Sequence, residues 1–371
     1  MIVGVPKEIK NHEYRVGLTP DQVKDLCMYG HQVLIQRKAG EAIGFLDDHY
    51  AMAGATLVDG ATEIFSQSEM IIKVKEPQLG ECALLRRDQI LFTYLHLAPD
   101  VPQTNALIES GATCIAYETV TSPSGHLPLL APMSEVAGRM SIQAAAHHLE
   151  KSHGGRGLLM AGVPGVAAAN VVILGAGVVG QSALKMAVGM GAHVTILDKN
   201  LDRLREIDDL YGNRVHTVYS NLANIERAVL SADVVIGGVL IPGASAPKLV
   251  TKLLVSQMRP GAVLVDVAID QGGCFETSRA TTHESPTYTV DDVIHYCVAN
   301  MPGAVARTST MALTNATSPF VLEIANKGLM QSLKDNTHLL NGLNVYQGHI
   351  TYEAVARAQG REYLNPQNIF H

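Results

Sequence analysis

Four side chains capable of acid–base or ion-pairing chemistry follow segments that are typical of buried β-strands. They are Arg15, Lys75, His96 and Asp270, which come after or end the runs at residues 2–5, 70–75, 90–94 and 262–267. An open parallel sheet places its ligand-contacting groups beyond the carboxyl ends of its strands, so we expect the four to meet in one cleft. Taken singly, each has a simpler interpretation: a surface ion pair, a strand-end cation, a buried histidine and a turn-forming aspartate.

The four residue types complement one another chemically. The planar guanidinium of Arg15 matches a carboxylate and can bind it through two hydrogen bonds. Lys75 is a compact cation that can polarise a carbonyl or imine. The imidazole of His96 belongs to a type that exchanges protons near neutral pH, and the carboxylate of Asp270 can orient and activate a water molecule. The sequence leaves open how His96 and Asp270 divide the proton transfers.

A glycine-rich turn provides the strongest single pattern in the chain. Gly175, Gly177 and Gly180 follow the candidate strand 171–174, and Asp198 ends the next strand about 20 residues later. This arrangement is typical of a turn that holds the pyrophosphate of a dinucleotide at a helix start, with the acidic residue on the adenosine ribose. Asp198 would repel a 2′-phosphate, which favours NAD over NADP, although the cations at 199, 203 and 205 could tolerate one. A tight turn without a ligand is the alternative.

The alternation of strands and helices predicts an α/β protein with two Rossmann-like, doubly wound parallel sheets and a cleft between the domains. We expect a discontinuous substrate domain over residues 1–130 and 305–371, and an NAD-binding domain over residues 131–304. Ser134 is a plausible N-cap for the helix before Gly154. Pro319 is expected to break the helix predicted over residues 309–326.

Composition excludes several classes of protein. The 371 residues carry a net charge of −7, so the basic surplus of a nucleic-acid binder is missing. Five scattered cysteines without a CxxC pair, together with early charges at the N-terminus, favour a cytoplasmic protein without a disulfide framework. Residues 158–184 lack charge, but glycines and a proline interrupt them, so a buried strand and helix explain them better than a membrane span. The pairs His147–His148 and Arg86–Arg87 are expected to be solvated and without function, and the cysteines to be packing residues.

Several separate segments together resemble the L-alanine dehydrogenase family over essentially the whole chain. They are residues 5–10, 15–20, 73–77, 133–139, 175–180 and 300–303. The resemblance implies that Arg15 and Lys75 hold the substrate and that His96 and Asp270 are catalytic. It also implies a set of cofactor-binding residues: Ser134, Gly175, Gly177, Val178, Val179, Gly180, Asp198, Arg203, Ser220, Val239, Leu240, Val267, Asn300 and Met301.

The resemblance implies reversible, NAD-dependent oxidative deamination of L-alanine to pyruvate and ammonia. Hydride leaves Cα for the nicotinamide, and water then hydrolyses the imine. Neither a metal, a nucleic acid nor a membrane is expected to take part. A homo-oligomer, hexameric in this family, is expected.

Two other functions stay open at this point. The cofactor-binding subunit of nicotinamide nucleotide transhydrogenase is similar, but it would not need an amino-acid pocket, and saccharopine dehydrogenase is a more distant relative. A non-catalytic NAD-binding sensor or structural module could keep the glycine turn and Asp198 without the four polar residues.

Overall fold

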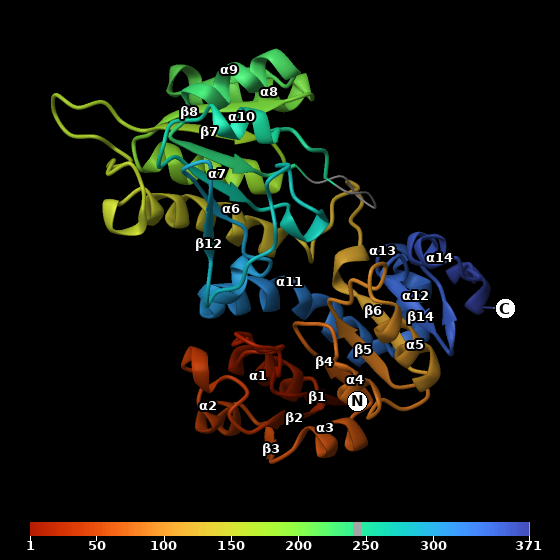
Figure 1. Ribbon diagram of the computed structural model, residues 1–371. Helices are drawn as coiled ribbons and strands as arrows, with labels where there is room; N and C mark the ends of the chain where they lie inside the picture. The colour runs from red at the N-terminus through yellow and green to blue at the C-terminus, as the bar shows by residue number, and fades with distance from the viewer. Residues whose placement is uncertain (240–245, 371) are drawn as a thin grey trace. The chain divides into compact units, whose positions relative to one another are not determined.

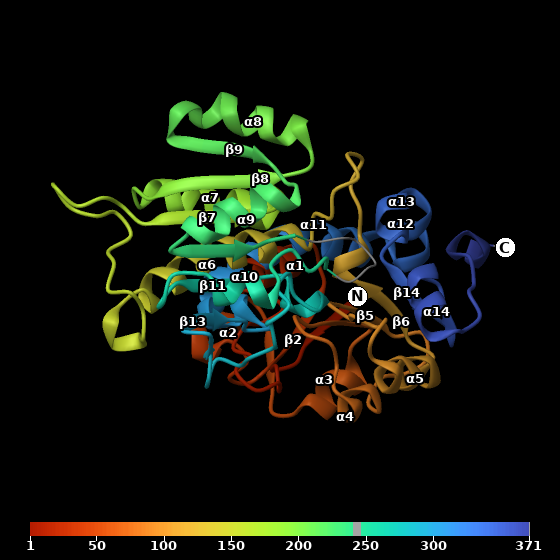
Figure 2. The same cartoon turned by 45° about the horizontal axis from the view of Figure 1, so that its top comes forward.

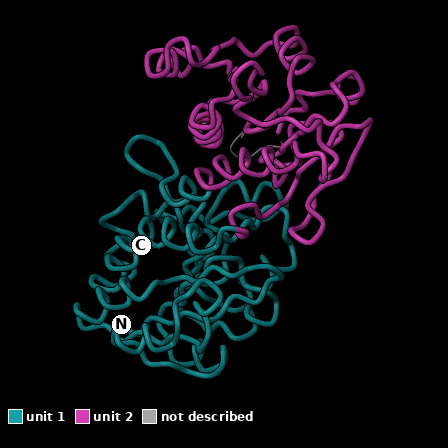
Figure 3. The backbone as a smooth tube through the Cα atoms, turned by 90° about the vertical axis from the view of Figure 1, so that its left-hand side faces the viewer, with its two compact units in different colours: residues 1–133, 305–371 teal, residues 134–304 magenta. Residues whose placement is uncertain are grey.

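Strands and helices alternate along the chain and form two sheets, each at the centre of its own unit. The computed structural model describes residues 1–239 and 246–370. Unit 1 comprises residues 1–133 and 305–371, and unit 2 comprises residues 134–304 (Figure 3). The α/β class predicted from the sequence, with two Rossmann-like sheets, is confirmed.

Unit 1 is built on an eight-stranded sheet in the order β15-β14-β6-β5-β4-β1-β2-β3 (Figure 1). The first six strands along the chain are mutually parallel and lie in the order 3-2-1-4-5-6 of dinucleotide-binding folds. Strand β14 is antiparallel to β6, and β15 is antiparallel to β14. The strands are β1 (Ile2–Val5), β2 (Gln32–Gln36), β3 (Thr56–Val58), β4 (Met70–Ile72), β5 (Ile90–Thr93), β6 (Thr113–Ala116), β14 (Leu343–Tyr346) and β15 (His349–Ile350).

The register of unit 1 stacks apolar side chains from neighbouring strands into one core layer. Ile71 pairs with Leu91, which pairs with Cys114, and all three are fully buried in the same cluster. Helices cover the sheet: α1 (Pro20–Met28), α2 (Asp47–Met52), α3 (Ala61–Gln67), α4 (Leu79–Cys82), α5 (Val101–Ser110), α11 (Ala306–Lys327), α12 (Leu329–Asp335), α13 (Thr337–Leu340) and α14 (Glu353–Gln359), with 3₁₀ turns η1 (Glu41–Ile43), η2 (Tyr117–Thr119) and η7 (Pro366–Phe370).

Unit 2 repeats the same strand order in a seven-stranded sheet, β12-β13-β11-β10-β7-β8-β9. Six strands are parallel in the order 3-2-1-4-5-6, and β12 is antiparallel at one edge. The strands are β7 (Asn170–Leu174), β8 (His193–Asp198), β9 (Val215–Tyr219), β10 (Val234–Gly237), β11 (Val263–Asp266), β12 (Thr287–Val290) and β13 (Val293–Tyr296).

Helices cover both faces of this sheet, so its central strands carry consecutive apolar residues. In β7, Val171 and Ile173 belong to one core cluster, whereas Val172 and Leu174 belong to another. Helix α8 packs against β8 and β9, as Figure 2 shows. The helices are α6 (Ala131–His148), α7 (Val178–Gly189), α8 (Leu201–Tyr211), α9 (Leu222–Ser231) and α10 (Lys252–Ser256), with 3₁₀ turns η3 (Lys151–His153), η4 (Gly212–Arg214), η5 (Ile269–Gln271) and η6 (Met301–Val305).

The two predicted helix boundaries at Ser134 and Pro319 are wrong. Helix α6 begins at Ala131, so Ser134 lies in its first turn and is not the cap. Pro132 is tolerated there because the first N–H groups of a helix have no intrahelical partner. Helix α11 continues through Pro319, since Thr317, Val321 and Ile324 keep one buried face on both sides of the proline.

The expectation that His147 and His148 are both solvated is half wrong. His148 is 8% exposed, and its ring centre lies 5.7 Å from that of Tyr296 in β13. All five cysteines are free, four of them buried. Within residues 1–239 and 246–370, no helix combines the length and the apolar character that a membrane span requires.

Two helical glycines of unit 2 are expected to respond in opposite ways to alanine. At Gly138 in α6, a Cβ would lie 2.2 Å from the carbonyl oxygen of Val179, so the helices would have to move apart. We expect Gly138→Ala to lower the free energy of unfolding by about 1–3 kcal/mol. Gly189 ends α7 with open space where a Cβ would go, so Gly189→Ala should raise it by about 0.4–1 kcal/mol. Urea unfolding of both variants tests this, and equal changes would contradict the packing described.

Candidate functional site

The glycine turn between β7 and α7 needs two of its three glycines for its own folding. Gly175 has a φ of +101°, and a Cβ there would lie 2.9 Å from the carbonyl oxygen of Gly238. A Cβ on Gly180 would lie 1.7 Å from the carbonyl oxygen of Gly175. Gly177 is different, because it is exposed and its Cβ would meet nothing within 4 Å. The second glycine therefore leaves bare backbone that a ligand can approach closely.

Helix α7 starts at this turn with uncapped amides. Its N-cap is Gly177, which has no side chain, and no acidic residue stands in the first turn. The amides of Val178 and Val179 belong to the first turn, whose N–H groups have no partner within the helix. The positive end of the helix dipole adds to their attraction for an anion. The turn thus fits the pyrophosphate of a dinucleotide.

Asp198, at the end of β8, holds the glycine turn in place. Its Oδ2 accepts a hydrogen bond from the amide of Ala176 at 2.6 Å, and its Oδ1 accepts one from the amide of Asn200 at 2.7 Å. The backbone of Ser220 donates to the Asp198 carbonyl at 3.0 Å, which sets these two residues side by side. A carboxylate offers about four acceptor sites, so two remain for ribose hydroxyls. The sequence did not predict this second, structural task.

The other cofactor residues predicted in unit 2 mostly follow the carboxyl ends of its parallel strands. A Cβ on Gly175 would touch Val239 after β10, and one on Gly238 would touch Val179. These contacts bring the turn and the β10 end together. The structure also describes five other predicted cofactor residues: Ser134 in α6, Arg203 in the first turn of α8, Val267 after β11, and Asn300 with the buried Met301 beyond β13. The predicted residue Leu240 lies outside the described part of the chain.

The loop that carries Asp270 is organised by a buried carboxylate. Asp270 is exposed within η5, after β11. Asp266, which is fully buried, accepts hydrogen bonds from the amides of Ala268, Cys274 and Phe275 and from the hydroxyl of Ser278. Burial raises the pKa of Asp266, and these hydrogen bonds oppose the rise. Asp266 therefore fixes both ends of the loop that presents Asp270.

Three predicted residues of unit 1 follow β1, β4 and β5, which are neighbours in the sheet. The first of them, Arg15, is 3% exposed and is bound through two of its nitrogens by one carboxylate. Its Nε and Nη2 donate to the two oxygens of Glu13 at 2.7 and 2.6 Å, and its Nη1 lies 3.2 Å from the sulfur of Met133. Burial disfavours the charged guanidinium, but the hydrogen bonds and charge of Glu13 outweigh this effect and raise the pKa of Arg15.

The backbone at Lys75 is tied to a buried cluster of charges. Glu8 accepts hydrogen bonds from the amides of Val74 and Lys75 at 2.7 and 3.4 Å, and its other oxygen pairs with Lys73 at 3.0 Å. Lys73 is fully buried and also pairs with Glu81 at 2.9 Å. The Lys75 side chain is 18% exposed, and its Nζ lies 3.6 Å from Glu76. Glu8 and Lys73 thereby fix the segment after β4 that carries Lys75.

His96 projects from a strained backbone position beside an aromatic ring. Its φ is +50°, which is uncommon for a residue with a side chain. The carboxylate of Glu118 accepts from the His96 amide at 2.6 Å and lies 3.8 Å from Nδ1. The ring stacks on Tyr94 with centres 5.8 Å apart, while the side chain stays 48% exposed. Strain of this kind persists where the surroundings impose it and is common at functional sites.

The acidic residues that orient the predicted cations and bases were not predicted from the sequence. They are Glu8, Glu13, Glu118 and Asp266. The sequence did contain a signal for Glu8: Lys73 falls inside an apolar run, and a buried cation there must have a buried anion beside it. The partner of Arg15, Glu13, lies in an irregular loop, and the partner of His96, Glu118, lies in the short 3₁₀ turn η2, so spacing carries no such signal for either.

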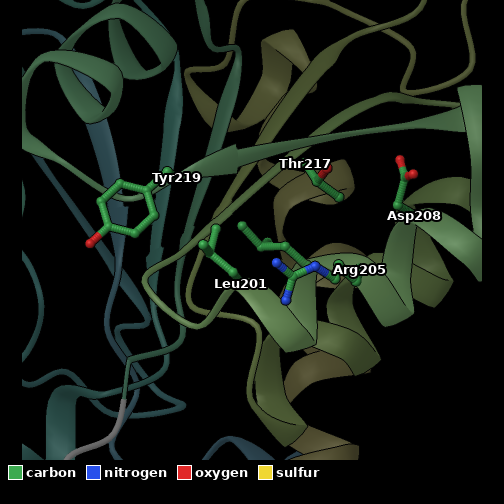
Figure 4. A pocket seen from close by; sticks show the side chains of 6 residues that line it. Leu201, Arg205, Asp208, Thr217 and Tyr219 are labelled. Carbon is green, nitrogen blue, oxygen red and sulfur yellow. The ribbon is translucent and has the colours of Figure 1, made fainter.

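A separate shallow pocket lies between α8 and β9 of unit 2. Figure 4 shows Arg205 and Asp208 on the helix side and Thr217 and Tyr219 on the strand side. Arg205 pairs with Asp202 of its own helix. None of the predicted site residues that the structure describes lines this pocket, so we assign it no part in the chemistry.

Comparisons with known proteins agree along the whole chain. The models of the family named alanine dehydrogenase/PNT match residues 4–137 with the N-terminal domain and residues 141–353 with the C-terminal domain. An alanine dehydrogenase of Halomonas elongata is 58% identical over 369 residues, covering 100% of both chains. One of Bacillus subtilis is 56% identical, covering 98% of this chain and 96% of the relative.

Solved structures show the same likeness. A structure titled L-alanine dehydrogenase superimposes with a TM-score of 0.94 at 52% identity, covering 97% of this chain and 99% of the other. A transhydrogenase from Sinorhizobium meliloti has a TM-score of 0.81 at 23% identity, covering 95% and 100%, and so shares the fold. The chain belongs to the alanine dehydrogenase/PNT family.

Proposed function

We propose that the chain catalyses the reversible, NAD-dependent oxidative deamination of L-alanine to pyruvate and ammonia. The observation that carries the proposal is the position of Arg15, Lys75 and His96, which follow three neighbouring strands of unit 1. Full-length relatives at 52–58% identity named alanine dehydrogenase support the same reaction. NAD⁺ supplies the hydride acceptor.

The cations of unit 1 suit a small amino acid. The planar guanidinium of Arg15 carries five N–H donors, a number that allows it to bind Glu13 and a substrate carboxylate at the same time. Glu13 also offsets its charge, which leaves recognition to hydrogen-bond geometry. Lys75 adds a positive charge that can stabilise the carbonyl oxygen of pyruvate as it develops.

Proton transfers fall to His96 and Asp270. His96 is half exposed, so its imidazole can pass protons between the substrate and solvent. Asp270 is exposed on a loop fixed by Asp266 and can activate the water that attacks the imine carbon. Collapse of the resulting carbinolamine then releases ammonia and leaves pyruvate.

The other candidate functions lack a use for these groups. A hydride-transfer subunit of a transhydrogenase, or a non-catalytic NAD-binding module, has no need of a guanidinium buried against a carboxylate. An increase in NADH absorbance at 340 nm with L-alanine and NAD⁺ tests the choice. NAD⁺ binding without any turnover of small amino acids would refute the proposal.

We further propose a homo-oligomer, hexameric as the family resemblance implies, and a reducing cytoplasmic setting that suits five free cysteines.

Removing the charge at the ribose position is expected to change cofactor choice. In Asp198→Ser, a 2′-phosphate no longer meets a carboxylate, so kcat/KM for NADP relative to NAD should rise about tenfold or more. The absolute rate with NAD should fall because the glycine turn loses the bonds to Ala176 and Asn200. Asp202→Ser, on the exposed side of α8, is the control. An unchanged cofactor ratio in Asp198→Ser would show that this residue does not face the ribose.

Removing either proposed proton carrier is expected to slow turnover without loss of cofactor binding. His96→Ala and Asp270→Ala should each lower kcat by about 10²–10⁴, which is the usual contribution of a placed acid or base. The affinity for NADH, measured by fluorescence titration, should stay near that of the unchanged chain. Near-normal kcat in one variant would remove that residue from the mechanism.

A further inference from the structure

The end of helix α6 carries a cluster of potential metal ligands that the proposed reaction does not use. His147 lies in its last turn, and Glu150 and His153 follow in the segment that includes η3, coloured yellow in Figure 1. One ligand atom from each side chain lies within 4.8 Å of the other two. All three residues are exposed. We call these three residues the α6-end cluster.

We propose that the α6-end cluster binds a divalent transition-metal ion of the Zn²⁺ class. His147 lies thirteen positions along the helix from Ser134, the predicted cofactor contact at the other end of α6. At 1.5 Å per residue this distance is about 20 Å, so the metal would be remote from that contact. The site therefore goes beyond the proposed function and does not depend on it.

The distances within the cluster are close to those of a coordination sphere. Tetrahedral zinc, with bonds of about 2.0–2.2 Å to nitrogen and oxygen, places its ligand atoms about 3.4 Å apart. Glu150 Oε2 lies 3.5 Å from Nδ1 of His153, and Oε1 lies 3.8 Å from Nδ1 of His147. The two imidazole ring centres are 3.8 Å apart. Small rotations of exposed side chains would complete the geometry.

The donor set also selects among metals. Two imidazole nitrogens and one carboxylate oxygen suit zinc, copper or nickel, whereas magnesium and calcium prefer oxygen ligands alone. The cluster lies at the C-terminal end of α6, where the helix dipole favours a cation. Solvent would fill the remaining positions of the ion.

A third histidine gives independent support. His148 is more than nine-tenths buried, and its Nδ1 has no hydrogen-bond partner in the described part of the chain. Its ring centre lies 5.2 Å from that of His147 and 5.6 Å from that of His153. A buried polar nitrogen without a partner is costly, and a water on the metal can supply its hydrogen bond. The alternative is that Glu150 merely pairs with the two neighbouring imidazoles, as exposed ion pairs do.

A bound ion would join the last turn of α6 to η3 and so stabilise unit 2. It would not touch the glycine turn, so kcat should be the same with and without the metal. Because the metal binds the folded chain, the melting temperature should rise with its concentration.

The test is a calorimetric titration of the full-length chain with ZnCl₂ in a metal-free, non-chelating buffer, with melting curves alongside. We expect one saturable site per chain. His153→Ala and Glu150→Gln should each weaken zinc binding about 10- to 100-fold or more and abolish the melting shift. Both side chains are exposed, so the metal-free variants should melt like the unchanged chain.

Two control variants identify the site. His216→Ala removes an exposed histidine of β9, and Cys27→Ser removes the one cysteine that is not buried. Both should bind zinc with unchanged affinity. The proposal is overturned if the unchanged chain shows no saturable binding, if His153→Ala and Glu150→Gln bind as tightly as it does, or if a control variant loses the site instead.

Discussion

A cation buried in a protein needs an anion beside it, and this constraint shapes the substrate side of the chain. Lys73 is fully buried between Glu8 and Glu81, and Arg15 is buried against Glu13. Removing one partner of such a pair typically costs about 3–5 kcal/mol, so the pairs hold their loops firmly. Glu8 extends this control to the backbone at Lys75. The Arg15 guanidinium and the backbone that carries Lys75 are thus positioned before any substrate arrives.

The two units use one strand order for two chemical tasks. Both sheets place six parallel strands as 3-2-1-4-5-6, and both gather their candidate groups beyond the carboxyl ends of those strands. In unit 2 the groups are mainly backbone amides and the carboxylate of Asp198, which suit phosphates and a ribose, together with Asp270 after β11. In unit 1 they are charged side chains, which suit a small zwitterion. The difference lies in the loops and not in the fold, as is usual for folds that serve many functions.

The sequence predicted the buried strands well because short, unbroken Val and Ile runs, such as β7 and β11, are typical of strands covered on both faces. The glycine turn was equally clear, since two of its glycines are required sterically. The edge strand β9 was not predicted, because its half-exposed residues lack such a run. The helix break predicted at Pro319 was wrong because packing along α11 overrides the tendency of proline to interrupt a helix. The pairing of Glu13 with Arg15 depends on irregular backbone, which no periodicity reveals.

The most direct test of the substrate site is the kinetics of Glu13→Asp, which keeps the buried charge but withdraws the carboxylate by one methylene. If Glu13 orients Arg15 for the substrate carboxylate, KM for pyruvate should rise about 10- to 100-fold, because a shift on the order of 1 Å is enough to spoil such alignment. The affinity for NADH should not change, and circular dichroism should report an intact fold. An unchanged KM for pyruvate in a folded Glu13→Asp variant would contradict the claim that paired buried charges prepare the substrate site.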